Sequence, residues 1–159
     1  VLSVFLMISY NFVGTIVVET RMKEKNLIIQ LLRSNAFVEE KLNASLKPHG
    51  LSLPQFNVLR ILRGRQGAPA NLSNIQEQMI KPMSNTSRLV DKLIDKGWVS
   101  RDICKYNRRK VEIFITENGL NALQQLDDLV AHEERQIMGM LSEKKQKSLL
   151  KLLVKVTAC

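Results

Sequence analysis

The stretch "SNTSRLVDKLIDKGWVSRDICKYNRRKVEIFITENGL", residues 84–120, decides the fold because its apolar spacing changes from helical to strand-like within a few residues. At about 100° per residue, segment 83–97 places its apolar side chains on one side of a helix, which Gly97 ends. Two short runs rich in Val, Ile and Phe follow, "WVSRDI" and "KVEIFIT", joined by the basic link "CKYNRR". The stretch therefore predicts a helix followed by a β-hairpin.

The tip of the predicted hairpin carries the densest positive charge in the chain, with four cations in residues 105–110. Within the second strand, Val111, Ile113 and Ile115 lie on the same side. We expect these three side chains to pack on the helices, so that the basic tip projects into solvent.

Upstream, apolar residues recur at spacings of three and four over 26–46, a helical pattern that Pro48 and Gly50 stop. Ser52 is an N-cap candidate for a second helix that runs toward Gly64.

A short third helix precedes the helix at 83–97. Asn71 or Ser73 can cap this short helix, and Pro82 prevents it from continuing into the next one. A short helix, a tight turn and a second helix with a small-polar and basic outer face form the arrangement that inserts a recognition helix into the major groove of DNA.

Five residues of this arrangement are candidates for DNA contact. Ser84, Asn85 and Arg88 lie near the N-terminal end of the second helix, where base edges come within reach. Arg makes a bidentate contact to guanine and Asn one to adenine, whereas Lys81 and Lys92 at the margins suit phosphates. The alternative is that this face is an ordinary solvated helix surface.

The adjoining hairpin favours DNA over that alternative. Its tip offers Lys105, Arg108 and Arg109, which suit phosphates or a narrow, electronegative minor groove beside the occupied major groove.

Downstream, a long helical pattern covers 120–141, and Ser142 can cap a last helix. These helices and the first one have more apolar surface than a small domain needs, which favours a homodimer; a larger single-chain core is the alternative. The predicted fold is mainly α with a small β-hairpin wing, a winged helix-turn-helix with N- and C-terminal dimerisation helices. Its parts are an apolar N-terminal segment (1–21), an N-terminal dimerisation helix (22–50), a winged-helix DNA-binding lobe (51–116) and C-terminal dimerisation helices (117–159).

Residues 1–21 are mostly apolar, but polar residues interrupt them and no basic leader precedes them, so they make a poor signal peptide and a marginal membrane span. From Met22 the composition is that of an ordinary cytosolic amphipathic helix. Our interpretation is that 1–21 lie outside the functional fold; the alternatives are an arm that covers a dimer surface and a membrane anchor.

The composition limits the partners and the chemistry. In a chain of 159 residues, 24 Lys and Arg against 15 Asp and Glu give a net charge of +9, which suits nucleic acid or an anionic membrane surface. Nine cations and three anions in 81–110 contribute +6 of it. Two cysteines and two histidines, far apart, predict neither a disulfide framework nor a metal site, and they fit a cytoplasmic protein without a cofactor.

In the motifs "SRLVDKL", "KGWV" and "ITENGL", with the arginine-rich link before the last, the chain resembles MarR-type winged-helix transcription regulators over about residues 23–156. The resemblance implies a homodimer on a pseudo-palindromic site in double-stranded DNA and, as in many members, a small-molecule effector. Wings of this family usually carry Asp, any residue, Arg. Here Asn107, Arg108 and Arg109 stand at those positions, so Arg109 matches the groove-contacting arginine and Asn107 replaces the acidic residue.

The leading hypothesis is therefore a sequence-specific DNA-binding transcription regulator whose affinity responds to an effector. We expect a repressor, and an activator is the alternative. The alternative is a basic peripheral-membrane protein anchored by its apolar N-terminus. An enzyme is not expected, because no nucleophile paired with a base and no glycine-rich phosphate loop stands out.

Overall fold

The structure is a computed structural model that describes residues 26–104 and 111–158. The chain divides into two compact units, Val1–Val38 and Glu39–Cys159. In the first unit, the described residues form the beginning of helix α2 (Leu27–Leu46), whose second half belongs to the other unit. The apolar segment predicted at 1–21 lies outside the described residues.

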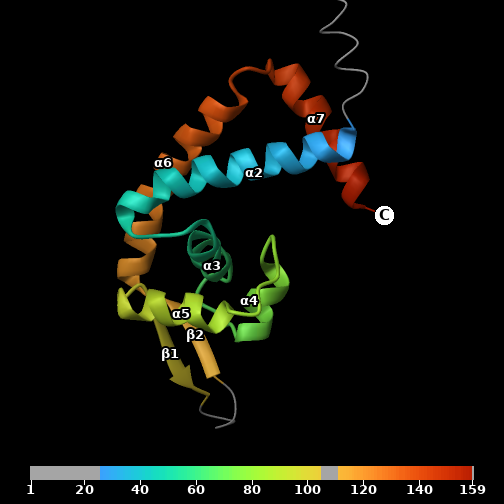
Figure 1. Cartoon of the computed structure of the whole chain (residues 1–159). Coiled ribbons are helices and arrows are strands. Elements are labelled where there is room, and N and C mark those ends of the chain that lie inside the picture. The colour runs from blue at the N-terminus through green and yellow to red at the C-terminus, as the bar shows by residue number, and fades with distance from the viewer. Residues whose placement is uncertain (1–25, 105–110, 159) are drawn as a thin grey trace, which may run out of the picture. The chain divides into compact units, whose positions relative to one another are not determined.

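The second unit contains the elements that the sequence predicts, in the same order (Figure 1). After the end of α2 they are α3 (Leu53–Gly64), α4 (Leu72–Gln78), α5 (Thr86–Asp95), β1 (Val99–Ile103), β2 (Val111–Ile115), α6 (Glu117–Met138) and α7 (Glu143–Thr157). A short 3₁₀ helix that the sequence does not predict, η1 (Lys47–His49), lies between α2 and α3.

The predicted starts of α3 and α4 are confirmed. Ser52 is the N-cap of α3, and its backbone N–H donates to Oε1 of Gln55 at 3.0 Å. Asn71 is the N-cap of α4, and its Oδ1 accepts a hydrogen bond from the backbone N–H of Asn74 at 2.8 Å. These bonds satisfy backbone groups that a helix terminus would otherwise leave without a partner.

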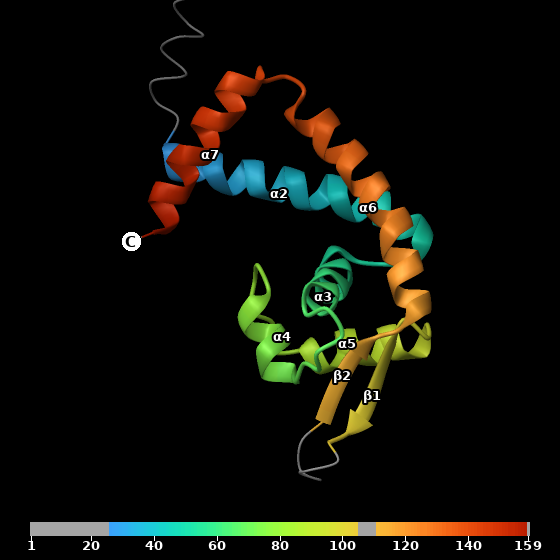
Figure 2. The ribbon, with the colours of Figure 1, turned by 180° about the vertical axis from the view of Figure 1, so that it is seen from behind.

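Helix α3 is central to the core of the second unit, because it contacts α4, α5, α6 and β2. Side chains from these elements are fully buried against one another: Leu59, Ile75, Val90, Leu93, Ile113 and Leu123. Figure 2 shows from behind how α4, α5 and the hairpin gather around α3, with the two strands extending beyond the helices.

Strands β1 and β2 form the predicted antiparallel hairpin, with Val99 opposite Ile115 and Ile103 opposite Val111. Ala70, just before α4, adds a bridge to Ile113 through hydrogen bonds of 3.0 and 2.8 Å. The expectation that Val111 packs on the helices is wrong: it is 38% exposed, whereas Ile113 is fully buried. Val111 pairs with the exposed outer end of β1, beyond the reach of the helical core.

The start of α6 is bound to the end of α5. Thr116 is the N-cap of α6: its Oγ1 accepts from the N–H of Gly119 at 3.0 Å and donates to the carbonyl oxygen of Gly97 at 2.7 Å. Helix α7 starts after Ser142 as predicted. Within the described ranges, no helix combines the length and the apolar character that crossing a lipid bilayer requires.

Candidate nucleic-acid interface

Helices α4 and α5 form a helix-turn-helix, with residues 79–85 as the turn. The second helix is shorter than the predicted 83–97, since it spans only Thr86–Asp95. The hydroxyl of Thr86 donates to the carbonyl oxygen of Met83 at 2.6 Å, and its N–H bonds to the same oxygen at 3.3 Å. These bonds close a tight turn over residues 83–86, and the helix begins where this turn ends. At the other end, Gly97 adopts a left-handed conformation with φ of 70°, as a helix-ending glycine does.

The predicted reading residues lie on the exposed side of this unit. Arg88 and Lys92 are exposed on α5, while Ser84 and Asn85 are exposed in the turn, with Asn85 at the N-cap position. The opposite side of α5 is buried and consists of Thr86, Leu89, Val90 and Leu93. The amphipathic pattern thus placed the faces correctly, although it placed Ser84 and Asn85 in the helix itself.

Lys81 lies in the turn and faces a carboxylate. Its Nζ is 3.8 Å from Oε1 of Glu39 in α2, and the Lys81 side chain remains 74% exposed. Such an exposed pair contributes little to stability, so Lys81 can exchange this partner for a phosphate at low cost.

An ion pair that the sequence does not predict joins α5 to the hairpin. Nη2 of Arg101 in β1 lies 2.8 Å from Oδ1 of Asp91 in α5. Arg101 therefore belongs to the same surface as Arg88 and Lys92. The residue spacing carries no signal for this pair, because it depends on how the hairpin folds back against the helix.

The remaining candidates, Lys105, Arg108 and Arg109, lie outside the described residues. The described strands end at Ile103 and resume at Val111, so this segment connects their outer ends.

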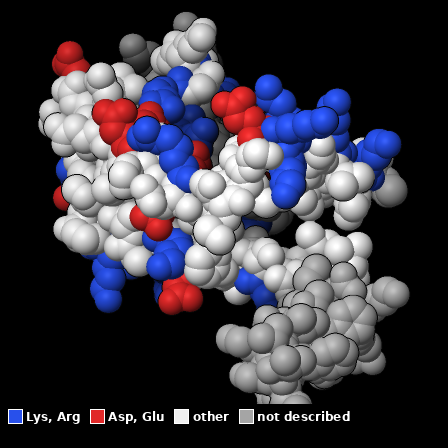
Figure 3. Space-filling view, turned by 90° about the horizontal axis from the view of Figure 1, so that it is seen from above, with Lys and Arg blue, Asp and Glu red and all other residues white. Residues whose placement is uncertain are grey.

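A second group of cations, which the sequence analysis did not single out, lies on α7. Figure 3 shows Lys side chains gathered on the part of the surface formed by this helix. They are Lys144, Lys145, Lys147, Lys151 and Lys155, all of them exposed, with Glu143 as the helix's one acidic residue. The net charge of the chain is therefore not confined to the helix-turn-helix and the hairpin.

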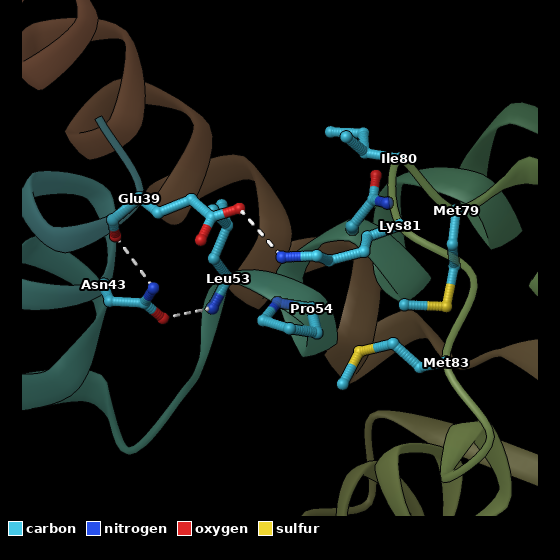
Figure 4. A pocket seen from close by; sticks show the side chains of 9 residues that line it. Glu39, Asn43, Leu53, Pro54, Met79, Ile80, Lys81 and Met83 are labelled. Carbon is cyan, nitrogen blue, oxygen red and sulfur yellow. Dashed lines mark hydrogen bonds and ion pairs between the residues drawn. The ribbon is translucent and has the colours of Figure 1, made fainter. Parts of the chain in front are cut away.

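A pocket of about 240 Å³ lies behind the turn between α4 and α5 (Figure 4). Its lining consists of Glu39, Asn43, Leu53, Pro54, Asn57, Met79, Ile80, Lys81 and Met83. Asn43 holds α2 to α3 at one side, because its Nδ2 donates to the carbonyl oxygen of Glu39 at 2.8 Å and its Oδ1 accepts from the N–H of Leu53 at 2.9 Å. The pocket is mostly apolar, with one ion pair at its edge.

A helix-turn-helix with an exposed polar and basic second helix, followed directly by a two-stranded hairpin, defines a winged helix-turn-helix protein, a class that binds DNA. Among the described residues, no group of three or more His, Cys, Asp or Glu is arranged to hold a metal ion.

Comparison with known proteins identifies the family. The model of the MarR family matches residues 51–111. The chain is 32% identical to the HTH-type transcriptional regulator PecS of Dickeya dadantii (strain 3937), over 84% of this chain and 81% of PecS. It is 27% identical to the HTH-type transcriptional regulator MhqR of Bacillus subtilis (strain 168), over 85% of this chain and 93% of MhqR.

A solved structure supports the same assignment. A mutant of MarR from E. coli, complexed with operator DNA, matches with a TM-score of 0.73 and 25% identity, over 82% of this chain and 92% of that one. The chain belongs to the MarR family. It is a DNA-binding transcription regulator and not an enzyme, which confirms this part of the leading hypothesis.

Proposed function

We propose that the protein is a homodimeric, effector-responsive repressor that acts in the cytoplasm and reads its operator through α5. The observation that carries the proposal is the exposed group Ser84, Asn85 and Arg88 at the N-terminal end of α5, with the opposite side of the helix fully packed. A recognition helix in the major groove presents this end to the base edges.

Each exposed side chain has a role that its chemistry suits. Arg88 reads guanine with two parallel hydrogen bonds, and Asn85 reads adenine. Lys81 and Lys92 contact phosphates on either side, and these contacts set the register without carrying sequence information. Lys105, Arg108 and Arg109 reach the backbone or the neighbouring minor groove from the tip of the hairpin.

Dimerisation is proposed from apolar side chains that the single chain leaves exposed. On α2 they are Leu27, Ile28, Ile29, Leu32 and Phe37, and on α7 they are Leu149, Leu150, Leu152, Leu153, Val154 and Val156. Patches of this kind mark interaction surfaces on soluble proteins. The proposed organisation is a dimerisation helix in 22–50, the DNA-binding lobe in 51–116 and dimerisation helices in 117–159.

The pocket behind the turn is the proposed effector site. Its floor is apolar, and the Glu39–Lys81 pair offers a charged group of either sign to a small ligand. Because Lys81, Met83 and Ser84 are parts of one turn, a ligand that displaces Lys81 from Glu39 also shifts the start of α5. That coupling is the route by which an effector lowers operator affinity.

The test is a fluorescence-anisotropy titration of the purified protein against the duplex upstream of its own gene and against a scrambled duplex, at several salt concentrations. We expect tight binding to the upstream duplex and weaker, more salt-dependent binding to the scrambled one. Arg88→Ala should lower operator affinity by about 1–3 kcal/mol. Equal and weak binding to both duplexes would contradict the proposal.

The matched control is Arg135→Ala. Arg135 is an exposed arginine near the end of α6, and its Nε donates to the carbonyl oxygen of Ala131 within the same helix. This substitution removes one positive charge from the chain, as Arg88→Ala does, but not from α5. A loss of the same size in both variants would show that Arg88 acts only through net charge.

A further inference from the structure

Two methionines flank the turn that starts the recognition helix. Met79 follows the last residue of α4, and Met83 lies three residues before α5. Both line the pocket behind the turn, and Figure 4 shows their thioether side chains extending from the turn toward Pro54. Met79 is only 6% exposed at the protein surface, so the pocket is its route to small solutes.

The hydroxyl of Thr86 connects both methionines. It donates to the carbonyl oxygen of Met83 at 2.6 Å and lies 3.9 Å from the sulfur of Met79. A threonine hydroxyl has one proton to donate, and a thioether sulfur is a weak acceptor. In the reduced protein the Met83 carbonyl oxygen therefore accepts the hydrogen bond from Thr86, and this bond fixes the first turn of α5.

We propose that Met79 and Met83 are sites of oxidation by hypochlorous acid, and that the sulfoxide at Met79 takes the Thr86 hydroxyl away from Met83 and thereby lowers DNA affinity. In this reaction the thioether sulfur gains one oxygen and loses two electrons. The chlorine of hypochlorous acid is reduced to chloride, and one proton is released. The inference rests on the proposed function in one respect, the reading of DNA through α5.

The consequence follows from the place of the new oxygen. Oxidation converts a flexible apolar side chain into a polar one. Thr86, which is 4% exposed, is the hydroxyl within reach of the Met79 sulfur. The sulfoxide oxygen and the Met83 carbonyl oxygen then compete for one donor, and whichever loses is left without its partner. Methionine sulfoxide reductases reverse this modification, so the change in DNA affinity is reversible.

The experiment uses the full chain with Cys104→Ser and Cys159→Ser, which removes thiols that would react with the same oxidant. The protein is treated with increasing hypochlorous acid, and peptide mass spectrometry measures oxygen addition at each methionine. Hydrogen exchange of the amides in the first turn of α5 reports the loss of the Thr86 bond. Anisotropy with the upstream duplex reports DNA affinity. Each variant is compared with its own untreated sample.

The matched variants are Met79→Leu with Met83→Leu, and Met140→Leu alone. Leucine conserves the side-chain volume, so the turn keeps its packing. Met140 is 92% exposed between α6 and α7 and serves as the control for a methionine that oxidises without touching the turn. We expect oxidation to lower DNA affinity roughly tenfold in the parent and in Met140→Leu, the effect of about one buried hydrogen bond. The double leucine variant should keep its DNA affinity after the same treatment.

Three results would overturn the inference. They are full oxidation of Met79 without faster exchange in α5, an equal loss of affinity in the double leucine variant, and oxidation of Met140 while Met79 stays reduced. If the untreated protein fails to bind the upstream duplex at all, the proposed function fails, and the exchange of the α5 amides still decides whether Met79 controls the turn.

Discussion

Asp91 in α5 and Arg101 in β1 form an ion pair, with 2.8 Å between Oδ1 and Nη2, that joins the recognition helix to the wing. The two side chains are 48% and 33% exposed, so the pair contributes about 0.2–1 kcal/mol to stability at most. Its greater effect is electrostatic, because Arg101 neutralises the carboxylate that lies on the helix proposed to face phosphates.

Arg101→Ala should therefore weaken DNA binding, because it leaves Asp91 as an uncompensated negative charge. The double variant Asp91→Ala with Arg101→Ala should recover part of that affinity, as anisotropy titrations at one salt concentration would show. If the double variant binds as weakly as Arg101→Ala, Arg101 contacts DNA directly and the pairing with Asp91 is incidental.

Gly119→Ala should destabilise the protein by about 1–3 kcal/mol. A Cβ at Gly119 would lie far inside contact distance of the carbonyl oxygen of Trp98 and 2.9 Å from Cγ1 of Ile115. Urea unfolding followed by circular dichroism measures the change. The control is Gly64→Ala in the last turn of α3, where a Cβ meets nothing within 4 Å, and we expect it to stabilise by about 0.4–1 kcal/mol. A neutral Gly119→Ala would mean that α6 can move away from Trp98 freely.

Asn71→Ala should reduce stability by about 0.5–2 kcal/mol, because it removes the acceptor that caps α4. Helix α4 has only seven residues, so the absence of one cap affects a large part of it. Ser73→Ala, in the first turn of the same helix, is the control. An equal loss in both variants in urea unfolding would assign the effect to helix propensity and not to the cap.

Arg109→Ala should weaken operator binding and flatten its salt dependence. The slope of log affinity against log salt should change by about 0.9 for each phosphate that the protein no longer neutralises. The measurement is the same anisotropy titration at four or more salt concentrations. Unchanged affinity together with an unchanged slope would exclude the tip of the hairpin from DNA binding.

Periodicity predicted most of the fold because most of the elements bury one face, although α7 buries none. The spacing over 26–46 and the alternation in 111–115 carry that information locally, and both elements exist. The start of α5 differs from the prediction because residues 83–85 form a tight turn, closed by the hydrogen bond from Thr86 to Met83, and this turn leaves no trace in the hydrophobic pattern.

The interface could be predicted only in part. The exposure of Arg88 and Lys92 follows from the amphipathic pattern. Ion pairs that join segments distant in the sequence cannot be predicted from that pattern. Arg101 meets Asp91, and Arg63 in α3 forms an ion pair with Asp127 in α6, only after the chain has folded. The pocket was missed for the same reason, since its walls come from α2, α3 and the turn before α5.

The Thr116 hydroxyl fixes the start of α6 relative to the segment that follows α5. This hydroxyl bonds both to Gly97, just after the recognition helix α5, and to Gly119 in α6. A movement of α6 along its axis therefore also displaces the end of α5. Helix α6 has 22 residues and is about 33 Å long, so a small change of its direction at this fixed end moves its far end by a large distance. A slight tilt of α6 at its junction with α7 would rotate the recognition helix α5. In a dimer, this tilt would change the distance between the two recognition helices, which must match one operator.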